Sequence, residues 1–304
     1  MSDTDILGKL QDIVGSDNIV SDEPMRKHTT FRIGGNADIF VRPESKEQIA
    51  EILRLCRKQD VPYFILGNGS NLLVGDRGFR GVVINIMDNM NDIKVDGGII
   101  KAQAGAMLIK VSRTARDNSL TGLEFASGIP GTIGGAIYMN AGAYGGEMKD
   151  VVTQVTAMDA EGEIYTFGTD ELEFSYRHSV IQQRDLIVLD VIMKLAAGDQ
   201  KIIDDRMSEL AVARRTKQPL EYPSAGSTFK RPEGYFAGKL IMDAGLRGYR
   251  VGDAQVSEKH CGFVVNRGNA TADDVIKLID DVKAKVSEEY DVVLEPEVRM
   301  IGEF

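Results

Sequence analysis

The sequence predicts a mixed α and β protein with more than one domain. Segments with the two-residue period of strands alternate with segments that have the 3.6-residue period of helices, and AAGDQ near residue 199 interrupts the pattern. A length of 304 residues suits two domains, or one large domain with an appendage. Hydrophobic residues make up 43% and charged residues 27%, so the composition favours neither disorder nor a membrane protein.

The first two hundred residues are expected to be rich in strands. A Gly-rich segment, 121–146, has no regular period and is expected to be an ordered functional loop, because apolar residues are interleaved with its glycines. The elements expected before residue 199 are a helix at 5–14, a strand at 37–41, a helix from cap Ser45 with Gln48 completing a capping box, strands at 61–66, 72–74, 82–86 and 99–104, a helix at 107–117, and strands at 151–158, 163–167 and 186–194.

The last hundred residues are expected to be more helical. Helices are predicted at 201–214, at 235–244 and from cap Thr271 to about Tyr290, and the segment SAGSTF (224–229) is predicted to be a turn. Val275, Leu278, Ile279, Val282 and Val286 lie on one face of the last helix.

Charge and cysteine usage exclude several function classes. The net charge of −10 argues against a general affinity for nucleic acid or anionic lipid. A local basic cluster, either a solvated face or a phosphate site, is formed by Arg214, Arg215, Lys217, Lys230 and Arg231.

Neither a disulfide framework nor a metal site is indicated. Cys56 and Cys261 are far apart and are expected to be core thiols, and the histidines lack metal-ligand spacing. The acidic N-terminus has no apolar region, which indicates a cytoplasmic protein.

Two glycine-rich loops are the candidates for chemistry. GNGSN, 67–71, fits neither the dinucleotide fingerprint nor the P-loop, because an apolar strand-like run follows it and no Gly-Lys-Ser/Thr occurs. Taken alone it is either a hairpin turn or an anion-binding turn. GIPGTIGGA, 128–136, is either a tight crossover or a second backbone surface for a ligand. Together the loops indicate a nucleotide diphosphate held from two sides.

For each candidate acid or base residue, the evidence for a catalytic role is weak when the residue is taken alone. Ser227 lies in a Gly turn beside Lys230, Arg177 lies in FSYRHS, and Glu297 lies in LEPEVR. A cap, a surface ion pair and an ordinary acidic residue are equally simple interpretations of the three.

Read together, these segments resemble the bacterial UDP-N-acetylenolpyruvoylglucosamine reductase family, flavoenzymes of peptidoglycan precursor synthesis. The likeness covers the chain nearly end to end, in family order. It rests on TTFRIGGNAD (29–38), ILGNGSNLLV (65–74), GLEFASGIPGTIGGAIYMNAGAYGGE (122–147), FSYRHS (174–179), SAGSTFKRP (224–232), AGKLIMDAGLRG (237–248) and LEPEVRMIG (294–302).

The resemblance implies an α+β architecture with an FAD-binding fold of the vanillyl-alcohol oxidase type. Two FAD-binding subdomains are expected at 1–86, where the C-terminal tail is also expected to pack, and at 87–199, followed by a substrate-binding domain at 200–304. FAD is expected to be held non-covalently, because neither loop contains His or Cys. Contacts to FAD are expected from Leu66, Gly67, Asn68, Gly69, Ser70, Asn71, Gly128, Ile129, Pro130, Gly131, Gly134, Gly135 and Asn140.

The implied reaction passes hydride from NADPH through FAD to the enolpyruvyl group of UDP-N-acetylglucosamine enolpyruvate, giving UDP-N-acetylmuramate. By resemblance Arg177 contacts the carboxylate end, Glu297 assists the developing enol and Ser227 donates the proton. Lys217 and Lys230 are expected to bind substrate. We expect no binding to nucleic acid, membranes or metal ions, and we expect the protein to be a monomer.

Two features limit the likeness, and two other functions stay open. Some family members have Asn where this chain has Arg231, and the chain resembles the shorter class without a Tyr-bearing segment over the substrate. The other functions are an FAD oxidoreductase of the same fold acting on a sugar or hydroxy acid, and a nucleotide-sugar-binding protein without catalysis.

Overall fold

The computed structural model describes residues 3–304, and side chains from residue 6 onward. It divides into two compact units. The first comprises the N-terminal residues to Ser21, Ile39–Asn68 and Gly81–Arg214, and the second comprises Asp22–Asp38, Gly69–Arg80 and Arg215–Phe304. The chain passes between the units within strands β1, β2 and β5, between Asn68 and Gly69, and near the end of helix α6. The three-domain division expected from the sequence stays a prediction.

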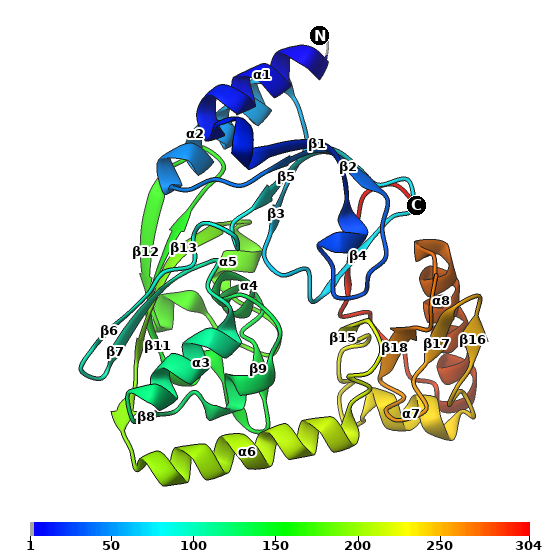
Figure 1. The fold of residues 1–304 in the computed structure, drawn as a ribbon. Helices are drawn as coiled ribbons and strands as arrows, with labels where there is room; N and C mark the ends of the chain where they lie inside the picture. Colours follow the sequence, from blue (N-terminus) through cyan, green and yellow to red (C-terminus); the bar gives the residue numbers. More distant parts are fainter. Residues whose placement is uncertain (1–2) are drawn as a thin grey trace. The chain divides into compact units, whose positions relative to one another are not determined.

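Helices α1 (Asp3–Val14) and α2 (Lys46–Gln59) pack together in the first unit (Figure 1). Ser45 is the N-cap of α2 and its hydroxyl accepts a hydrogen bond from the N–H of Gln48. The expected capping box differs in one respect, because the Gln48 side chain accepts from the N–H of Glu44 at 2.7 Å and not from that of Ser45. The other end of the Gln48 amide donates to Ile13 at the end of α1, which ties the two helices together.

A four-stranded sheet has the order β1-β2-β5-β3. Its strands are β1 (Ile19–Pro24), β2 (Asn36–Val41), β3 (Tyr63–Leu66) and β5 (Phe79–Asn85). The pair β3 and β5 is parallel, with Leu66 opposite Asn85. Their carboxyl ends therefore meet at one edge of the sheet, where the first glycine-rich loop begins.

An antiparallel five-stranded sheet of order β12-β11-β13-β7-β6 completes the core of the first unit. Its strands are β6 (Ile93–Asp96), β7 (Ile99–Gln103), β11 (Val152–Met158), β12 (Ile164–Gly168) and β13 (Ile187–Lys194). The strands expected at 151–158, 163–167 and 186–194 are confirmed. So is the helix expected at 107–117, which is α3 (Leu108–Asp117).

The aperiodic segment 121–146 is ordered and contains a short helix, α4 (Ile133–Tyr138), that the sequence pattern does not reveal. Two glycines in six residues hide its period, but Thr132 caps it and Ile133, Ala136 and Ile137 are buried. The remaining short elements of the first unit are η1 (Ser16–Asn18), β8 (Leu120–Thr121), η3 (Glu124–Gly128), β9 (Gly142–Ala143), β10 (Gly146–Glu147), η4 (Met148–Asp150), η5 (Asp170–Leu172), α5 (Val180–Gln183) and β14 (Ala196–Ala197).

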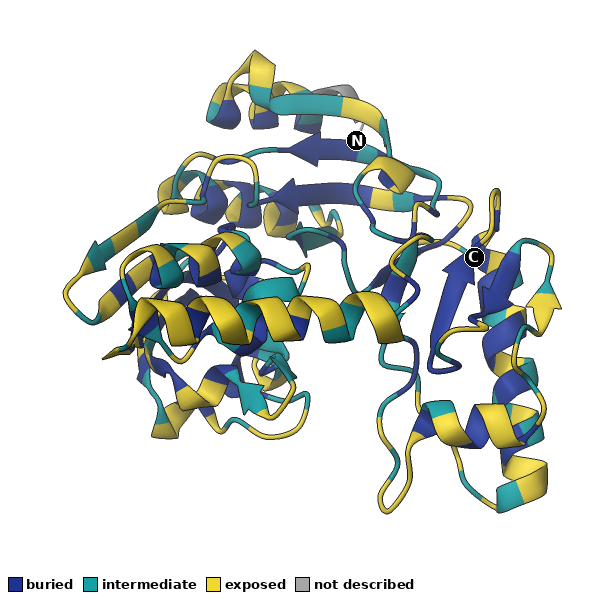
Figure 2. Ribbon diagram, turned by 60° about the horizontal axis from the view of Figure 1, so that its bottom comes forward, coloured by how far each residue is buried: buried dark blue, intermediate teal, exposed yellow. Residues whose placement is uncertain are grey.

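Helix α6 (Gln200–Lys217) confirms the expected charged helix and is exposed along most of its length (Figure 2). Of its residues only Ile203 and Leu210 are buried. Both cysteines are buried, as predicted for core thiols, and burial raises the pKa of the Cys56 thiol to about 12. In the described range 3–304, no helix is both long and apolar enough to cross a membrane.

The second unit packs two helices with an antiparallel sheet of order β15-β18-β17-β16. Helix α8 (Ala272–Tyr290) buries the predicted apolar face and has the predicted cap at Thr271, and α7 (Ala237–Asp243) lies beside it. The strands and the remaining short helix of this unit are η2 (Met25–Lys27), β4 (Leu72–Val74), β15 (Ser224–Ser227), β16 (Arg250–Val251), β17 (Ala254–Val256), β18 (Phe263–Asn266) and β19 (Arg299–Ile301).

Two pairings in this unit matter for function. The segment predicted as a turn, SAGSTF, begins with strand β15, which pairs with β18, so the turn prediction is wrong for residues 224–227. Pairing supplied by a distant strand outweighs the local preference of a Gly- and Ser-rich segment. The C-terminal strand β19 pairs in parallel with β4, which follows the GNGSN loop.

The N-terminus of α8 is held by a carboxylate from a distant loop. Asp76 accepts the N–H of Ala272 at 2.9 Å and that of Asp273 at 3.1 Å, using one oxygen for each. We expect Asp76→Ala to lower the free energy of unfolding by about 1–2 kcal/mol, because two helix N–H groups lose their acceptors. Chemical denaturation measures this. Asp280→Ala on the exposed face of α8 is the control and should change it by less than about 0.5 kcal/mol; equal losses in both variants would contradict the capping role.

Candidate active site

The two glycine-rich loops lie against each other in the first unit. Gly67 follows β3 directly, and a Cβ atom added to it would stand 2.4 Å from Thr132 Oγ1. The side chain of Asn68 donates a hydrogen bond from Nδ2 to the carbonyl oxygen of Pro130. The structure therefore brings together two segments that are far apart in the chain, and residue 67 must be glycine for them to approach this closely.

Both loops present backbone N–H groups that the protein does not use. Within the described part of the chain, no group accepts a hydrogen bond from the N–H of residues 67–71, nor from the N–H of Gly131 or Thr132. Successive unpaired N–H groups in a Gly-rich turn form an anion-binding arrangement. The loops thus offer donors suited to a diphosphate.

Other residues of the second loop shape it instead. The N–H of Ile133 donates to Ala106 and that of Gly134 donates to Ala104, both at 2.8 Å. A Cβ on Gly134 would lie 3.1 Å from the Cβ of Ala104, and the N–H of Gly135 is directed at Thr132 Oγ1. The predicted contribution of Gly134 and Gly135 to a cofactor site is therefore one of loop shape, because their N–H groups are taken.

Arg177 lies at the tip of a tight turn in the first unit. Ser175 and His178 exchange backbone hydrogen bonds of 3.2 Å, and Arg177 has a positive φ of 55°. The guanidinium lies 5.2 Å from the ring centroid of Tyr176. Non-glycine residues in this strained conformation persist where the surroundings impose it, often at functional sites.

Asn140, predicted as a cofactor contact, supports this turn. It is buried, and its Nδ2 donates to Glu147 at 2.6 Å and to the carbonyl of Ser175 at 3.1 Å. Its Oδ1 accepts the N–H of Lys149. Because both ends of the amide are engaged, Asn140 acts as a support for the Arg177 turn, together with Ser179, whose hydroxyl donates to Tyr138.

Arg214 is a candidate that the sequence flagged only as one member of a basic cluster. Its guanidinium lies against Gly128, where an added Cβ would fall 1.3 Å from Nη1, and it lies over the ring of Tyr144 at 5.6 Å. Burial lowers the pKa of this guanidinium, and interactions with Tyr144 act in the opposite direction. The structure thus places a partly desolvated cation directly at the second glycine-rich loop.

In the second unit, the remaining residues of the first loop are held by segments from both ends of the chain. Gly69 has a φ of 57°, and a Cβ on it would meet the carbonyl oxygen of His28 at 2.1 Å. The side chain of Asn71 donates to the carbonyl oxygen of Glu297 at 3.0 Å, and the Asn71 carbonyl accepts the N–H of Arg299. The Asn71 side chain thus holds the backbone of Glu297.

Ser227 and Glu297 belong to two segments that pair in the second unit. Residues 228–230 run alongside 295–297, with the N–H of Glu297 donating to Thr228 at 2.8 Å and the N–H of Lys230 donating to Glu295 at 2.9 Å. Thr228 is buried, and its hydroxyl oxygen accepts the N–H of Val264 in the neighbouring strand. The backbone pairing therefore sets Glu297 opposite Thr228, the residue that follows Ser227.

The two lysines expected to bind substrate differ in their surroundings. Lys217 is exposed as the last residue of α6. Lys230 forms an exposed ion pair with Glu295 at 3.1 Å, a kind of contact that costs little to exchange for another anion. Among the described residues, no group of three or more His, Cys, Asp or Glu side chains is arranged to hold a metal ion.

A substitution that adds one methyl group at residue 67 tests the contact between Gly67 and Thr132. We expect Gly67→Ala to lower the affinity for FAD by at least about ten-fold, because the added Cβ must displace Thr132 and separate the loops. Fluorescence titration of the protein with FAD measures this. Gly8→Ala is the control, since an added Cβ there meets no atom outside its own helix within 4 Å and affinity should not change; unchanged affinity in Gly67→Ala would contradict the role of the contact.

Comparison with known proteins agrees with this geometry. Residues 37–168 match the model of an FAD-binding domain, which includes both glycine-rich loops. Residues 218–301 match the C-terminal domain of UDP-N-acetylenolpyruvoylglucosamine reductase, which includes Ser227 and Glu297. At the level of fold alone, the chain is also similar to alkyldihydroxyacetonephosphate synthase, with a TM-score of 0.50 and 16% identity over 65% of this chain and 41% of that one.

Two full-length relatives and one solved structure share the same name. The UDP-N-acetylenolpyruvoylglucosamine reductase of Agathobacter rectalis is 55% identical, covering 94% of this chain and 95% of that protein, and the one of Clostridioides difficile is 50% identical over the whole of both. The crystal structure of the Thermus caldophilus reductase has a TM-score of 0.80 and 37% identity, covering 93% of this chain and 98% of that one. The predicted FAD-binding fold is thereby confirmed, and the chain belongs to the UDP-N-acetylenolpyruvoylglucosamine reductase family.

Proposed function

We propose that this protein reduces UDP-N-acetylglucosamine enolpyruvate to UDP-N-acetylmuramate with NADPH, through bound FAD, as a step of peptidoglycan precursor synthesis. The observation that carries the assignment is the pairing of 228–230 with 295–297, which sets Glu297 opposite Thr228, the residue after Ser227, within the domain that matches the family. Family membership supplies the substrate class, and Ser227 and Glu297, which lie on or next to these paired segments, are the residues that we assign to its protonation.

The first unit fits the diphosphate of FAD. Gly67, Asn68, Gly131 and Thr132 present unpaired N–H groups, and the close contact at Gly67 leaves no room for a side chain among them. Arg214 adds a positive charge at Gly128. A dianionic diphosphate would satisfy these donors, and the absence of His and Cys in both loops supports non-covalent binding.

FAD, when bound, supplies the hydride chemistry that links NADPH to the enolpyruvyl double bond. In our proposal the protein's own residues stabilise the negative charge that develops on the substrate and donate the proton. The Arg177 guanidinium binds the carboxylate end of the enolpyruvyl group, where negative charge develops. Its rigid turn, anchored through Asn140 and Ser179, limits the cost of orienting that charge.

In this proposal Ser227 is the proton donor and Glu297 supports the developing enol. A serine hydroxyl is a weak acid, so its proton transfer depends on nearby positive charge that stabilises the alkoxide. Lys230, three residues further on, is available once a substrate anion replaces Glu295, and Lys217 is exposed. We assign both lysines to the substrate. We also propose that the enzyme is a monomer and acts in the cytoplasm.

The assignment predicts a two-step colour change. The purified protein should show flavin absorbance that NADPH bleaches in the absence of oxygen, and UDP-N-acetylglucosamine enolpyruvate should restore it. Anaerobic stopped-flow absorbance follows both steps. Bleaching without restoration by this substrate would remove the assigned substrate, and oxygen consumption driven by a sugar alone would favour a different flavin oxidoreductase.

The proton-donor role of Ser227 predicts that a substitution there slows the second step, recolouring by the substrate, and not the first, bleaching by NADPH. Ser227→Ala should leave bleaching by NADPH within about two-fold of the unmodified rate and slow recolouring by about 10²- to 10⁴-fold, the contribution of a positioned proton donor. Ser224→Ala, the same change at the start of the same strand, should slow neither step. Equal loss in both steps for Ser227→Ala would contradict the proton-donor role.

A further inference from the structure

Asn85, the last residue of β5, uses only half of its hydrogen-bonding capacity within the protein. Its side chain is buried, with 1% of the residue exposed. Its Oδ1 accepts the N–H of Met87 at 2.8 Å and that of Asp88 at 3.3 Å. No group in the described range 3–304 accepts a hydrogen bond from its Nδ2.

Other buried asparagines of this chain do not show this pattern. Asn140 donates from Nδ2 to Glu147 and Ser175, and Asn266 donates from Nδ2 to the carbonyl of Phe31 at 3.2 Å. Leaving a buried amide N–H without an acceptor is costly, so such groups find a partner in nearly all folded proteins. The unpaired NH₂ of Asn85 therefore points to a partner outside the chain.

The orientation of the Asn85 amide is set by its surroundings. Rotating it by half a turn would direct its NH₂ at two backbone N–H groups, so the oxygen must face Met87 and Asp88. Among the described residues, no fully enclosed side-chain nitrogen or oxygen lacks a partner. The Nδ2 atom is consequently not fully enclosed, and a ligand can reach it.

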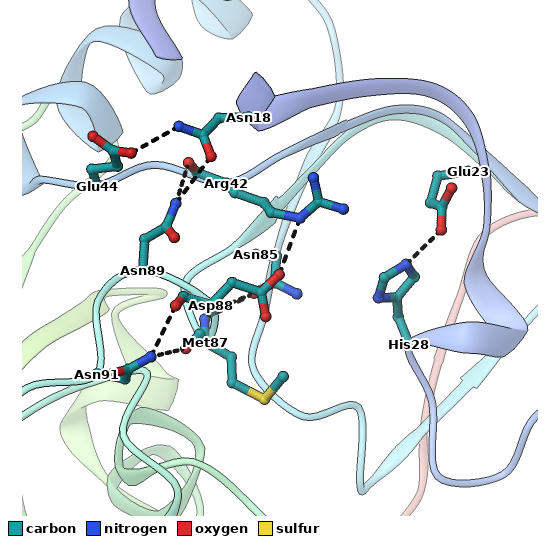
Figure 3. Close-up of polar contacts among 10 residues, drawn as sticks. All are labelled: Asn18, Glu23, His28, Arg42, Glu44, Asn85, Met87, Asp88, Asn89 and Asn91. Carbon is teal, nitrogen blue, oxygen red and sulfur yellow. Dashed lines mark hydrogen bonds and ion pairs between the residues drawn. The ribbon is translucent and has the colours of Figure 1, made fainter. Parts of the chain in front are cut away.

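A network of amides and one ion pair holds this carboxamide rigid (Figure 3). Asn91 donates from Nδ2 to the carbonyls of Met87 and Asp88, each at 2.9 Å, and so closes the turn that Asn85 caps. Arg42 forms an ion pair with Asp88 at 3.0 Å. The NH₂ group is thus preorganised, which lowers the entropy cost of using it for a ligand.

The position of Asn85 identifies the ligand. It stands opposite Leu66 in the parallel pair of β3 and β5, and the next N–H along, that of Ile86, donates to the carbonyl of Leu66 at 3.1 Å. Adjacent strands are about 4.8 Å apart, and the residue after Leu66 is Gly67, where the unpaired N–H groups begin. Asn85 therefore lies at the same sheet edge as the anion-binding loop.

We propose that Asn85 Nδ2 donates a hydrogen bond to an acceptor on the ADP half of FAD. This inference rests on the proposed function, which places FAD at the glycine-rich loops. In this arrangement one amide does two tasks. Its oxygen caps the turn after β5, and its nitrogen binds the cofactor, so the turn and the ligand share one rigid group.

Asn85→Asp tests the donor separately from the cap. The aspartate keeps the oxygen that accepts from Met87 and Asp88, loses the NH₂ and repels a diphosphate. We expect the dissociation constants of FAD and of ADP both to rise at least about ten-fold, as for a lost hydrogen bond. Fluorescence titration measures FAD and competition measures ADP. Asn91→Ala is the matched control, because it loosens the same turn and leaves the Asn85 NH₂ in place; affinity should fall less than about three-fold.

The outcomes separate this inference from the proposed function. If the unmodified chain binds FAD and Asn85→Asp binds it equally well, or if Asn91→Ala weakens binding as much, Asn85 only caps its turn and the inference is wrong. Weakened FAD with unchanged ADP would also overturn it, because the acceptor would lie outside the ADP half. No FAD binding by the unmodified chain would instead contradict the proposed function.

A measurement on the unmodified chain covers the case in which Asn85→Asp does not fold. The side-chain NH₂ signals of Asn85, assigned in isotope-labelled protein, should shift on addition of ADP, while those of Asn266 should not. Unshifted Asn85 signals at saturating ADP would overturn the inference.

Discussion

The close approach of Gly67 to Thr132 is the contact on which the proposed cofactor site depends. An ordinary Cβ at position 67 would stand 2.4 Å from the Thr132 hydroxyl, so the two loops meet only because glycine has no side chain. That approach leaves successive backbone N–H groups of both loops without partners in the described protein. A loop that cannot satisfy its own N–H groups is stable with an anion bound, and binding and folding of this region are therefore linked.

The second unit brings together the two segments that carry Ser227 and Glu297. It does so with backbone pairing between 228–230 and 295–297, so the relative position of Ser227 and Glu297 depends little on side-chain packing. Asn71 adds a side-chain hydrogen bond to the Glu297 carbonyl. Residues that the family motif marks as one loop thus serve two purposes, since Gly67 shapes the anion site and Asn71 supports the acid group.

Side-chain amides recur as positioning groups in this protein. Asn140 fastens the turn that carries Arg177, Asn71 holds the backbone of Glu297, and Asn85 caps the turn beside the first glycine-rich loop. An amide is uncharged and offers donors and an acceptor, so it can replace missing backbone partners in irregular segments at a lower desolvation cost than a carboxylate. This explains how long segments without regular structure stay ordered around a site.

Local sequence signals determined the helices and most strands. Apolar periodicity and capping residues predicted α2, α3, α6 and α8, because those preferences act within one or two turns. The motifs also identified the two glycine-rich loops and the family. Local preference failed at β15, where pairing with β18 decides the structure, and at α4, where glycines hide the period.

Only the tertiary structure decided which atoms are free for a ligand. The sequence marked Asn71, Gly134, Gly135 and Asn140 as cofactor contacts, which stays a prediction. In the structure the side chains of Asn71 and Asn140 and the N–H groups of Gly134 and Gly135 donate hydrogen bonds within the protein, whereas the backbone N–H of Asn71 does not. The sequence contained no sign of the unpaired amide of Asn85. The reason is physical: a hydrogen-bond donor is available only if no distant segment accepts from it, and that depends on long-range packing that a one-dimensional pattern does not contain.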